Sequence, residues 1–296
     1  MERTEVRLAA VDIGTNSMRL LIVHQIGDDT VEMGRWQRVT GLGIGVDATG
    51  LLSEEAIDRT LLALAEFGGR MRDMEVERRR AVATSASRDA GNRELFFDKA
   101  EVALGVRPEL ISGDEEARLA FTGATFGVPV PPPHIVVDIG GGSTEFVTVD
   151  GGRSLEMGSV RLTERVLGNR PTSVEDLAMA RGLVQESFAG IAATSGNVLG
   201  VAGTWTSLAG INRGDPEVHL SSLTAGEVSG LVERLALLTV EQTAALPGFD
   251  PARAPVILSG AVIAEGCLAA LGAQQVTVSN HDLLDGVVSL LLEPGW

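Results

Sequence analysis

One short sequence pattern occurs twice in this chain, and that repetition limits the possible folds more than any other feature. Residues 12–17 (DIGTNS) follow an apolar run, and residues 138–145 (DIGGGSTE) follow another, 126 positions later (138 − 12). Each copy is typical of a buried strand that ends in an aspartate, then a glycine-rich turn and a second strand. A single turn of this kind is most often an ordinary β-hairpin. Two in the same context predict a duplicated unit, with one turn in each half.

The residue types in both turns suit phosphate binding. Glycine permits close backbone approach and positive φ, so turn amides and hydroxyls can donate to phosphate oxygens, and an aspartate can hold a hard cation. A third strand-to-glycine turn, at 200–204 (GVAGT), binds phosphate in the same way or is only a tight bend. The phosphate candidates are Gly14, Thr15, Asn16, Ser17, Gly140, Gly141, Gly142, Ser143, Thr144, Gly203 and Thr204, and the strand-end cation candidates are Asp12 and Asp138.

The order of predicted elements is similar in the two halves. The first half begins with three strands (6–11, 18–26, 31–39), then a helix capped by Ser53, and further strands that alternate with helices. The second half has strands near 135, 144 and 154 and a helix capped by Thr172. It continues with a strand at 198–202, a helix beginning at Thr224, an apolar helix at 256–271, a strand and a closing helix. We expect an α/β protein with one mixed, helix-flanked sheet per half.

A proline-rich stretch at 129–133 is typical of a stiff connector between the halves. We therefore expect lobes at 1–128 and 129–296, with a central cleft for a polar ligand. Whether the closing helix at 283–293 completes the first lobe is left open.

Composition excludes several classes of protein. The single cysteine, Cys267, rules out an internal disulfide and a cysteine-based zinc cluster, and its apolar surroundings indicate a buried residue. A net charge of −16 argues against a broad nucleic-acid surface. We expect no signal peptide, because charged residues at 1–5 run straight into the first strand, and no membrane span. The expected location is the cytoplasm.

Two further segments of the first half carry polar side chains in unusual density. Residues 83–88 (ATSASR) place hydroxyls and Arg88 just after a strand, although a simple polar turn explains them equally well. Residues 111–118 (ISGDEEAR) start a helix with three consecutive carboxylates, which a favourable interaction with the helix dipole also explains.

Five segments, taken together and in order, resemble the exopolyphosphatase/guanosine pentaphosphate phosphohydrolase (Ppx/GppA) family: 12–19, 83–88, 111–118, 138–145 and 158–164. The resemblance implies a duplicated actin-like ATPase (ribonuclease H-like) fold and hydrolysis of a terminal phosphoanhydride with Mg²⁺. It implies that Glu116 is catalytic, that Asp138 and Glu145 hold the metal, and that Arg88 binds phosphate. Arg19, in the first of these segments, joins the phosphate candidates.

This sequence departs from the family at two places. Longer family members have an appended helical region with His-Asp metal pairs, and this sequence ends before that region. Without the region, binding of long polyphosphate is in doubt for this chain. Leu284 stands where the family often has arginine.

The favoured function is an exopolyphosphatase that releases terminal orthophosphate from inorganic polyphosphate. The alternative is a pppGpp 5′-phosphohydrolase that uses the same residues. An actin-like kinase or ATPase and a nucleotide-binding regulator without turnover fit less well. We expect no nucleic-acid or membrane partner, and a homodimer is left open.

Overall fold

The computed structural model describes residues 5–27, 29–126 and 128–293. Two compact units share the chain: the first comprises the residues up to Gly123 and those from Leu283 onward, and the second is Ala124–Asp282. Helix α12 (Leu283–Leu291) belongs to the first unit because its apolar side chains pack on strands of that unit. The boundary expected from the sequence was at 128/129, a few residues later.

The first unit is built on a five-stranded sheet in the order β3-β2-β1-β4-β5. Strands β1 to β3 form an antiparallel meander, and β4 and β5 run parallel to β1. The strands are β1 (Glu5–Ile13), β2 (Ser17–Ile26), β3 (Asp29–Val39), β4 (Arg78–Ala83) and β5 (Glu109–Leu110).

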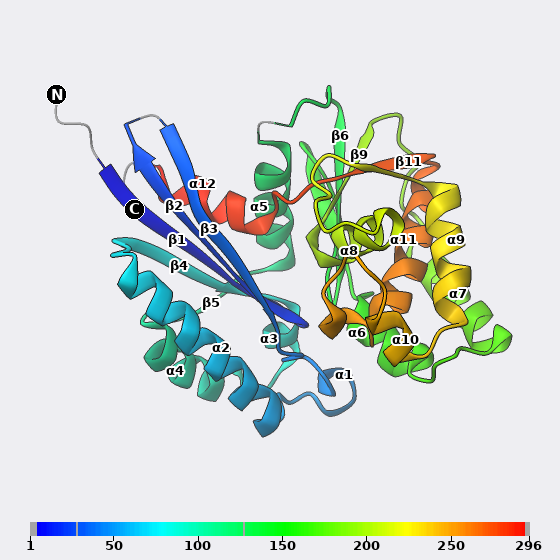
Figure 1. Ribbon diagram of the computed structural model, residues 1–296, viewed down its shortest axis with the longest axis horizontal. Helices are drawn as coiled ribbons and strands as arrows, with labels where there is room; N and C mark the ends of the chain where they lie inside the picture. Colours follow the sequence, from blue (N-terminus) through cyan, green and yellow to red (C-terminus); the bar gives the residue numbers. More distant parts are fainter. Residues whose placement is uncertain (1–4, 28, 127, 294–296) are drawn as a thin grey trace. The chain divides into compact units, whose positions relative to one another are not determined.

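Helices cover both faces of this sheet, and for that reason the sequence of β1 is a nearly continuous apolar run. Ala9, Val11 and Ile13 point into a core shared with α2 (Glu54–Asp73) and α4 (Arg93–Leu104). The alternate residues of β1 point into a second core with α12 and Leu119 of α5 (Gly113–Thr125). Figure 1 shows α2 and α4 on one side of the sheet and α12 on the other. The shorter helices of this unit are α1 (Val46–Thr49) and α3 (Ser85–Asp89).

The second unit contains a six-stranded sheet in the order β10-β11-β9-β6-β7-β8. It begins with an antiparallel meander, as the first unit does, and β9 and β11 then add in parallel. The strands are β6 (His134–Ile139), β7 (Thr144–Thr148), β8 (Gly151–Leu155), β9 (Asn197–Val201), β10 (Ser222–Thr224) and β11 (Gln275–Val278).

The helices of the second unit surround one large core. Trp205 is fully buried in it and donates its indole N–H to the carbonyl of Val137 at 3.0 Å. Helix α11 is apolar almost all round and largely buried, as expected for a central helix, and it contains the buried Cys267. The helices are α6 (Ser159–Leu162), which continues as the π-helix η1 (Thr163–Leu167), α7 (Val174–Ser187), α8 (Ala202–Arg213), α9 (Ala225–Ala236), α10 (Val240–Ala244), the 3₁₀ turn η2 (Pro251–Arg253) and α11 (Ile257–Leu271).

The helix caps predicted from the sequence can be compared with those in the structure. Ser53 caps α2, and Thr224 with Glu227 forms the predicted capping box at α9. The predicted cap at Thr172 is wrong by one residue: Ser173 accepts from the amide of Asp176, while the Thr172 hydroxyl donates to the carbonyl of Asn169.

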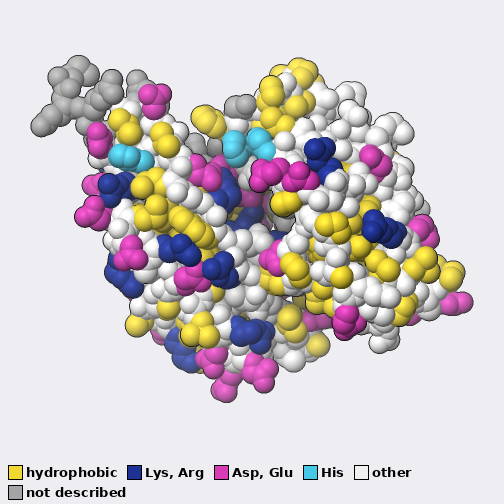
Figure 2. All heavy atoms as spheres, viewed as in Figure 1, with side chains coloured by type: hydrophobic (Ala, Val, Ile, Leu, Met, Phe, Trp, Pro, Cys, Tyr) yellow, Lys and Arg dark blue, Asp and Glu magenta, His cyan; other side chains and the backbone are white. Residues whose placement is uncertain are grey.

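On the face in view in Figure 2, basic side chains are interspersed with acidic ones. Among residues 5–27, 29–126 and 128–293, no helix has the length and apolar character needed to cross a membrane.

Candidate functional site

The two glycine-rich turns have the same backbone geometry. Gly14 donates its amide to the carbonyl of Ser17 at 3.1 Å, and Gly140 donates to Ser143 at 3.0 Å, each pair 126 residues from its counterpart. Neither glycine has a positive φ. Gly14 is required instead for close approach, because a Cβ there would lie 2.9 Å from the Ser17 carbonyl oxygen. At Gly14, glycine is therefore needed for a close backbone contact and not for a positive φ.

In each unit a second segment holds the turn by its carbonyls. The carbonyl of Thr15 accepts from the amide of Gly43 at 2.8 Å, and that of Gly141 accepts from Val160 at 2.8 Å. Gly158 packs so closely on the second turn that a Cβ would lie 2.3 Å from the Gly141 oxygen. The sequence motif at 158–161 therefore supports the turn.

Several amides of the two turns are not used by the part of the protein that the structure describes. Within the described residues, the amides of Thr15 and Asn16 donate no hydrogen bond, nor do those of Gly141 and Gly142. Successive amides in such a turn form a nest that suits an anion. Both turns thus have the donor arrangement expected of a phosphate site.

The two turns differ in charge at one pair of positions. In the first unit Asp12 lies directly opposite Arg19 on the neighbouring strand, and in the second Asp138 lies directly opposite Glu145. Arg19 donates Nε and Nη2 to Asp12 Oδ2 at 3.0 and 2.6 Å. The arginine therefore supplies the counter-charge of Asp12, and we leave Asp12 out of the metal set proposed below.

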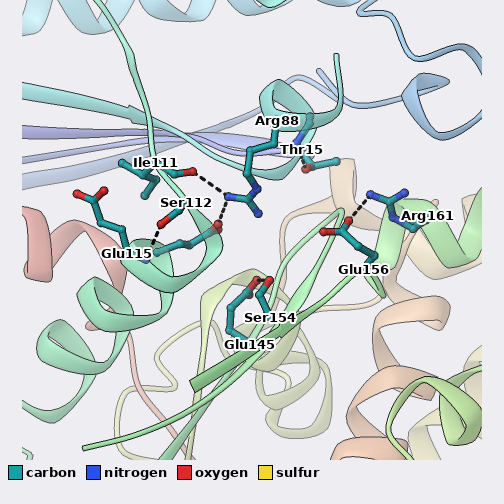
Figure 3. Close-up of polar contacts among 11 residues, drawn as sticks. Thr15, Arg88, Ile111, Ser112, Glu115, Glu145, Ser154, Glu156 and Arg161 are labelled. Atoms are coloured by element: carbon teal, nitrogen blue, oxygen red, sulfur yellow. Dashed lines mark hydrogen bonds and ion pairs between the residues drawn. The ribbon is translucent and has the colours of Figure 1, made fainter. Parts of the chain in front are cut away.

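Asp138 and Glu145 are two buried carboxylates on one face of a β-hairpin. Like charges directly opposite each other are destabilising, and a bound cation removes that cost. Ser154 donates to Glu145 Oε1 at 2.7 Å and so orients this carboxylate (Figure 3). The described residues hold no group of three or more metal-type side chains. Two carboxylates still fit Mg²⁺, which is usually held by one or two carboxylates together with water and substrate phosphate.

The structure distinguishes between neighbouring carboxylates at the start of α5. Glu115 pairs with the buried Arg80 at 2.9 Å, and its backbone amide donates to Ser112 Oγ at 3.1 Å (Figure 3). Glu116 points elsewhere and pairs with Arg88 Nη1 at 2.7 Å. Of these two, Glu116 is the buried one, with 8% of its surface exposed.

Burial raises the pKa of Glu116 to about 6, because desolvation disfavours the charged carboxylate. Arg88 acts in the opposite direction, and the negative charge of Asp12 adds to the increase. A carboxylate with a pKa near neutrality is suited to accept a proton from water.

Several buried donors lie in the segments at 15–16 and 85–88, which are joined by a hydrogen bond from the amide of Ala86 to Thr15 Oγ1. Four polar atoms here have no hydrogen-bond partner within the described residues: Asn16 Nδ2, Ser85 Oγ, Ser87 Oγ and Arg88 Nη2. Such atoms are rare in folded proteins and call for an explanation, for which a bound anion is suitable.

Two predicted phosphate ligands have another use in this structure. The hydroxyl of Thr144 donates to the carbonyl of Met157, and that of Thr204 donates to the carbonyl of Ile139. Both hydroxyls therefore stabilise the backbone around the second and third turns. Their role in phosphate binding stays a prediction.

Sequence reasoning missed one arginine and one strained residue near the third turn. The guanidinium of Arg253 lies where a Cβ on Gly203 would be, with Nη1 1.9 Å from that position, so Gly203 leaves room for it. Ala202 has a φ of 67°, which is unfavourable for a residue with a Cβ. Arg253 is the last residue of the 3₁₀ turn η2 and belongs to no recognisable phosphate motif, so no local signal in the sequence indicated it.

Comparisons with known proteins identify the family of this chain. Residues 21–293 match the model of the Ppx/GppA phosphatase family. The curated protein named Exopolyphosphatase 2 from Mycobacterium tuberculosis is 38% identical over 310 aligned positions, which cover 95% of this chain and 97% of the relative.

Solved structures lead to the same result. A crystal structure of an exopolyphosphatase-like protein has a TM-score of 0.90 at 35% identity and covers 98% of this chain and 99% of its own. The Aquifex aeolicus member of the Ppx/GppA family has a TM-score of 0.82 at 30% identity, with 99% and 100% covered. The two helix-flanked mixed sheets and these likenesses confirm the expected duplicated actin-like fold. The chain belongs to the Ppx/GppA phosphatase family.

Proposed function

We propose that this protein is a Mg²⁺-dependent exopolyphosphatase that releases terminal orthophosphate from inorganic polyphosphate. The observation that carries the proposal is Glu116, a buried carboxylate with a pKa of about 6 that is held at 2.7 Å by Arg88. The name of the Mycobacterium tuberculosis relative, Exopolyphosphatase 2, supports the choice of substrate.

The proposed reaction is attack of water on the terminal phosphoryl group. The water oxygen forms a bond to phosphorus, the bridging P–O bond breaks, and its electron pair stays on the shortened chain. Glu116 accepts the proton that the attacking water loses. Bound Mg²⁺ would neutralise charge on the phosphate oxygens.

The remaining residues have binding roles in this proposal. Asp138 and Glu145 would hold the metal, since their opposed carboxylates fit a hard cation. In the first unit the turn amides and Arg88 Nη2 are candidate donors to phosphate oxygens, and in the second unit the turn amides are, since fixed donors stabilise developing charge. Arg253, beside Gly203, is a further candidate for phosphate binding. The cytoplasmic location stays a prediction from the sequence, and a homodimer is left open.

A phosphate-release panel tests the proposal. The substrates are short, medium and long polyphosphates, pppGpp, ATP and a phosphate monoester, each with Mg²⁺ and with EDTA. We expect Mg²⁺-dependent orthophosphate release from polyphosphate at the highest kcat/KM. A higher kcat/KM for pppGpp would establish the alternative 5′-phosphohydrolase instead. Absence of release from every anhydride would reject the hydrolase and favour the regulator.

A further inference from the structure

Arg88 is a partly buried arginine, with 19% of its side chain exposed, and only part of its guanidinium makes hydrogen bonds within its own unit. Its Nη1 donates to Glu116 Oε2 at 2.7 Å and to the carbonyl of Ile111 at 3.2 Å (Figure 3). Its Nη2 is buried and has no hydrogen-bond partner within the described residues. One end of the guanidinium thus holds the candidate base, while the other end is available as a donor.

We propose that Arg88 is a positioning residue for Glu116 at the same time as it binds phosphate, with Nη1 fixing the base and Nη2 donating to a phosphoryl oxygen. This inference rests on the proposed hydrolase function. The guanidinium is planar and rigid, so the two contacts have a fixed relation to each other. One side chain thereby sets where the base stands relative to the phosphoryl group.

The backbone holds Arg88 in place for this role. The carbonyl of Ile111, just before α5, fixes Nη1 from one side, and Glu116 stands on the first turn of that helix. The start of α3 is held in turn by the bond from the Ala86 amide to Thr15. The base, the arginine and the first glycine-rich turn are therefore connected by hydrogen bonds within one unit.

The charged groups around Glu116 determine what loss of Arg88 does. Arg88 from α3 and Arg19 from β2 favour the carboxylate, whereas burial and Asp12 from β1 oppose it. Arg19 is held by Asp12, so we expect it to stay in place when Arg88 is changed. Removal of the Arg88 charge therefore raises the pKa of Glu116. Because a general base must be deprotonated, activity is lost as pH falls through that pKa, and a higher pKa moves this loss to higher pH.

Two substitutions of Arg88 separate its charge from its two-sided contact. Arg88→Gln removes the charge, so kcat/KM should fall by about 10²-fold or more and the acidic limb of the pH profile should rise by about one pH unit or more. Arg88→Lys keeps a charge beside Glu116 but cannot hold both partners with one rigid group. Its kcat/KM should also fall by about 10-fold or more, with the acidic limb close to its parental position.

The matched controls are Arg79→Gln and Arg79→Lys. Arg79 lies on β4 of the same unit, is half-exposed and contacts the carbonyl of Val76. Both controls should keep the parental pH profile and kcat/KM. An Arg88→Gln variant with lowered kcat/KM but an unmoved acidic limb would overturn the inference, because Arg88 would then bind phosphate without positioning the base. Parental kcat/KM in Arg88→Lys would also overturn it.

A readout without turnover separates this inference from the proposed function. The carboxyl carbon of Glu116 can be titrated by ¹³C NMR in the substrate-free protein, with Glu116→Gln identifying the signal and circular dichroism checking the fold. The pKa should lie near 6 in the parent and in Arg88→Lys, and higher in Arg88→Gln. An equal pKa in parent and Arg88→Gln refutes the pairing even if the enzyme is active. If the shift occurs in a protein that hydrolyses no anhydride, the proposed function fails while the pairing stands.

Discussion

Replacement of Glu145 by glutamine should change the stability of the protein in opposite directions with and without metal. Glu145 lies directly opposite Asp138 in the β6–β7 ladder, and neither residue is more than 6% exposed. Directly opposed side chains on one sheet face have Cβ atoms about 5 Å apart. Two negative charges at that distance repel by about 3 kcal/mol at an effective dielectric constant of about 20, whereas solvated pairs cost about 0.2–1 kcal/mol.

Glu145→Gln removes this repulsion and keeps the oxygen that accepts from Ser154. In EDTA the variant should therefore be more stable than the parent by about 1–2 kcal/mol, between the two limits. At about 2–4 °C per kcal/mol for a domain of this size, its Tm should rise by several degrees. Mg²⁺ at about 100 times its Kd should stabilise the parent by about 2.7 kcal/mol, and the variant far less.

The assay is thermal unfolding at pH 8 in EDTA and across a Mg²⁺ titration. Asp150→Asn is the control: it also removes a carboxylate, but from the exposed turn between β7 and β8, and it should leave the response to Mg²⁺ unchanged. The reasoning is refuted if Glu145→Gln is less stable than the parent in EDTA. It is refuted equally if the variant keeps the parental increase in Tm with Mg²⁺.

Three further predictions address the base, the second turn and the core. Glu116→Gln should lower kcat by about 10²-fold or more with little change in KM, and steady-state kinetics showing near-normal kcat would move the base elsewhere. Gly158→Ala should lower Tm by an amount equivalent to about 1–3 kcal/mol and reduce kcat/KM, because its Cβ would lie 2.3 Å from the Gly141 oxygen. The control Gly182→Ala has open space around its Cβ and should lower neither Tm nor kcat/KM. Equal melting curves for the two variants would contradict the packing argument. Trp205→Ala should destabilise the fold by about 3–5 kcal/mol in chemical denaturation, since Trp205 is fully buried, and a loss below about 1 kcal/mol would be inconsistent with that burial.

The duplicated turns made the fold readable from sequence, because their chemistry is local. A tight turn closed by Gly14 and Ser17 fixes the register of the hairpin, and in that register Asp12 faces Arg19. The charge pairing of the first unit thus follows from local sequence, whereas the role of Asp12 in holding a cation stays a prediction.

Other features depend on tertiary contacts. Whether Glu115 or Glu116 is buried depends on where Arg80 and Arg88 lie, and both are far from α5 in sequence. Residues 78–80 are three consecutive arginines, and only the tertiary structure shows that Arg80 is 6% exposed, because it pairs with carboxylates of α5 and β5. At the start of helix α8 the sequence predicted only a glycine turn, because the first residues of the helix are small and polar. The helix is stabilised by burial of Trp205, which is a tertiary contact and leaves no local signal.

Glu116 is proposed to act as the general base in the removal of single terminal phosphates from polyphosphate. The most direct measurement is a time course with a polyphosphate of defined length, in Mg²⁺, that follows both orthophosphate and the remaining chains for the parent and Glu116→Gln. We predict that the parent releases orthophosphate from the first time point with matching chain shortening, and that Glu116→Gln is slower by about 10²-fold or more. Internal cleavage without early orthophosphate, or equal rates for the two proteins, would contradict the account.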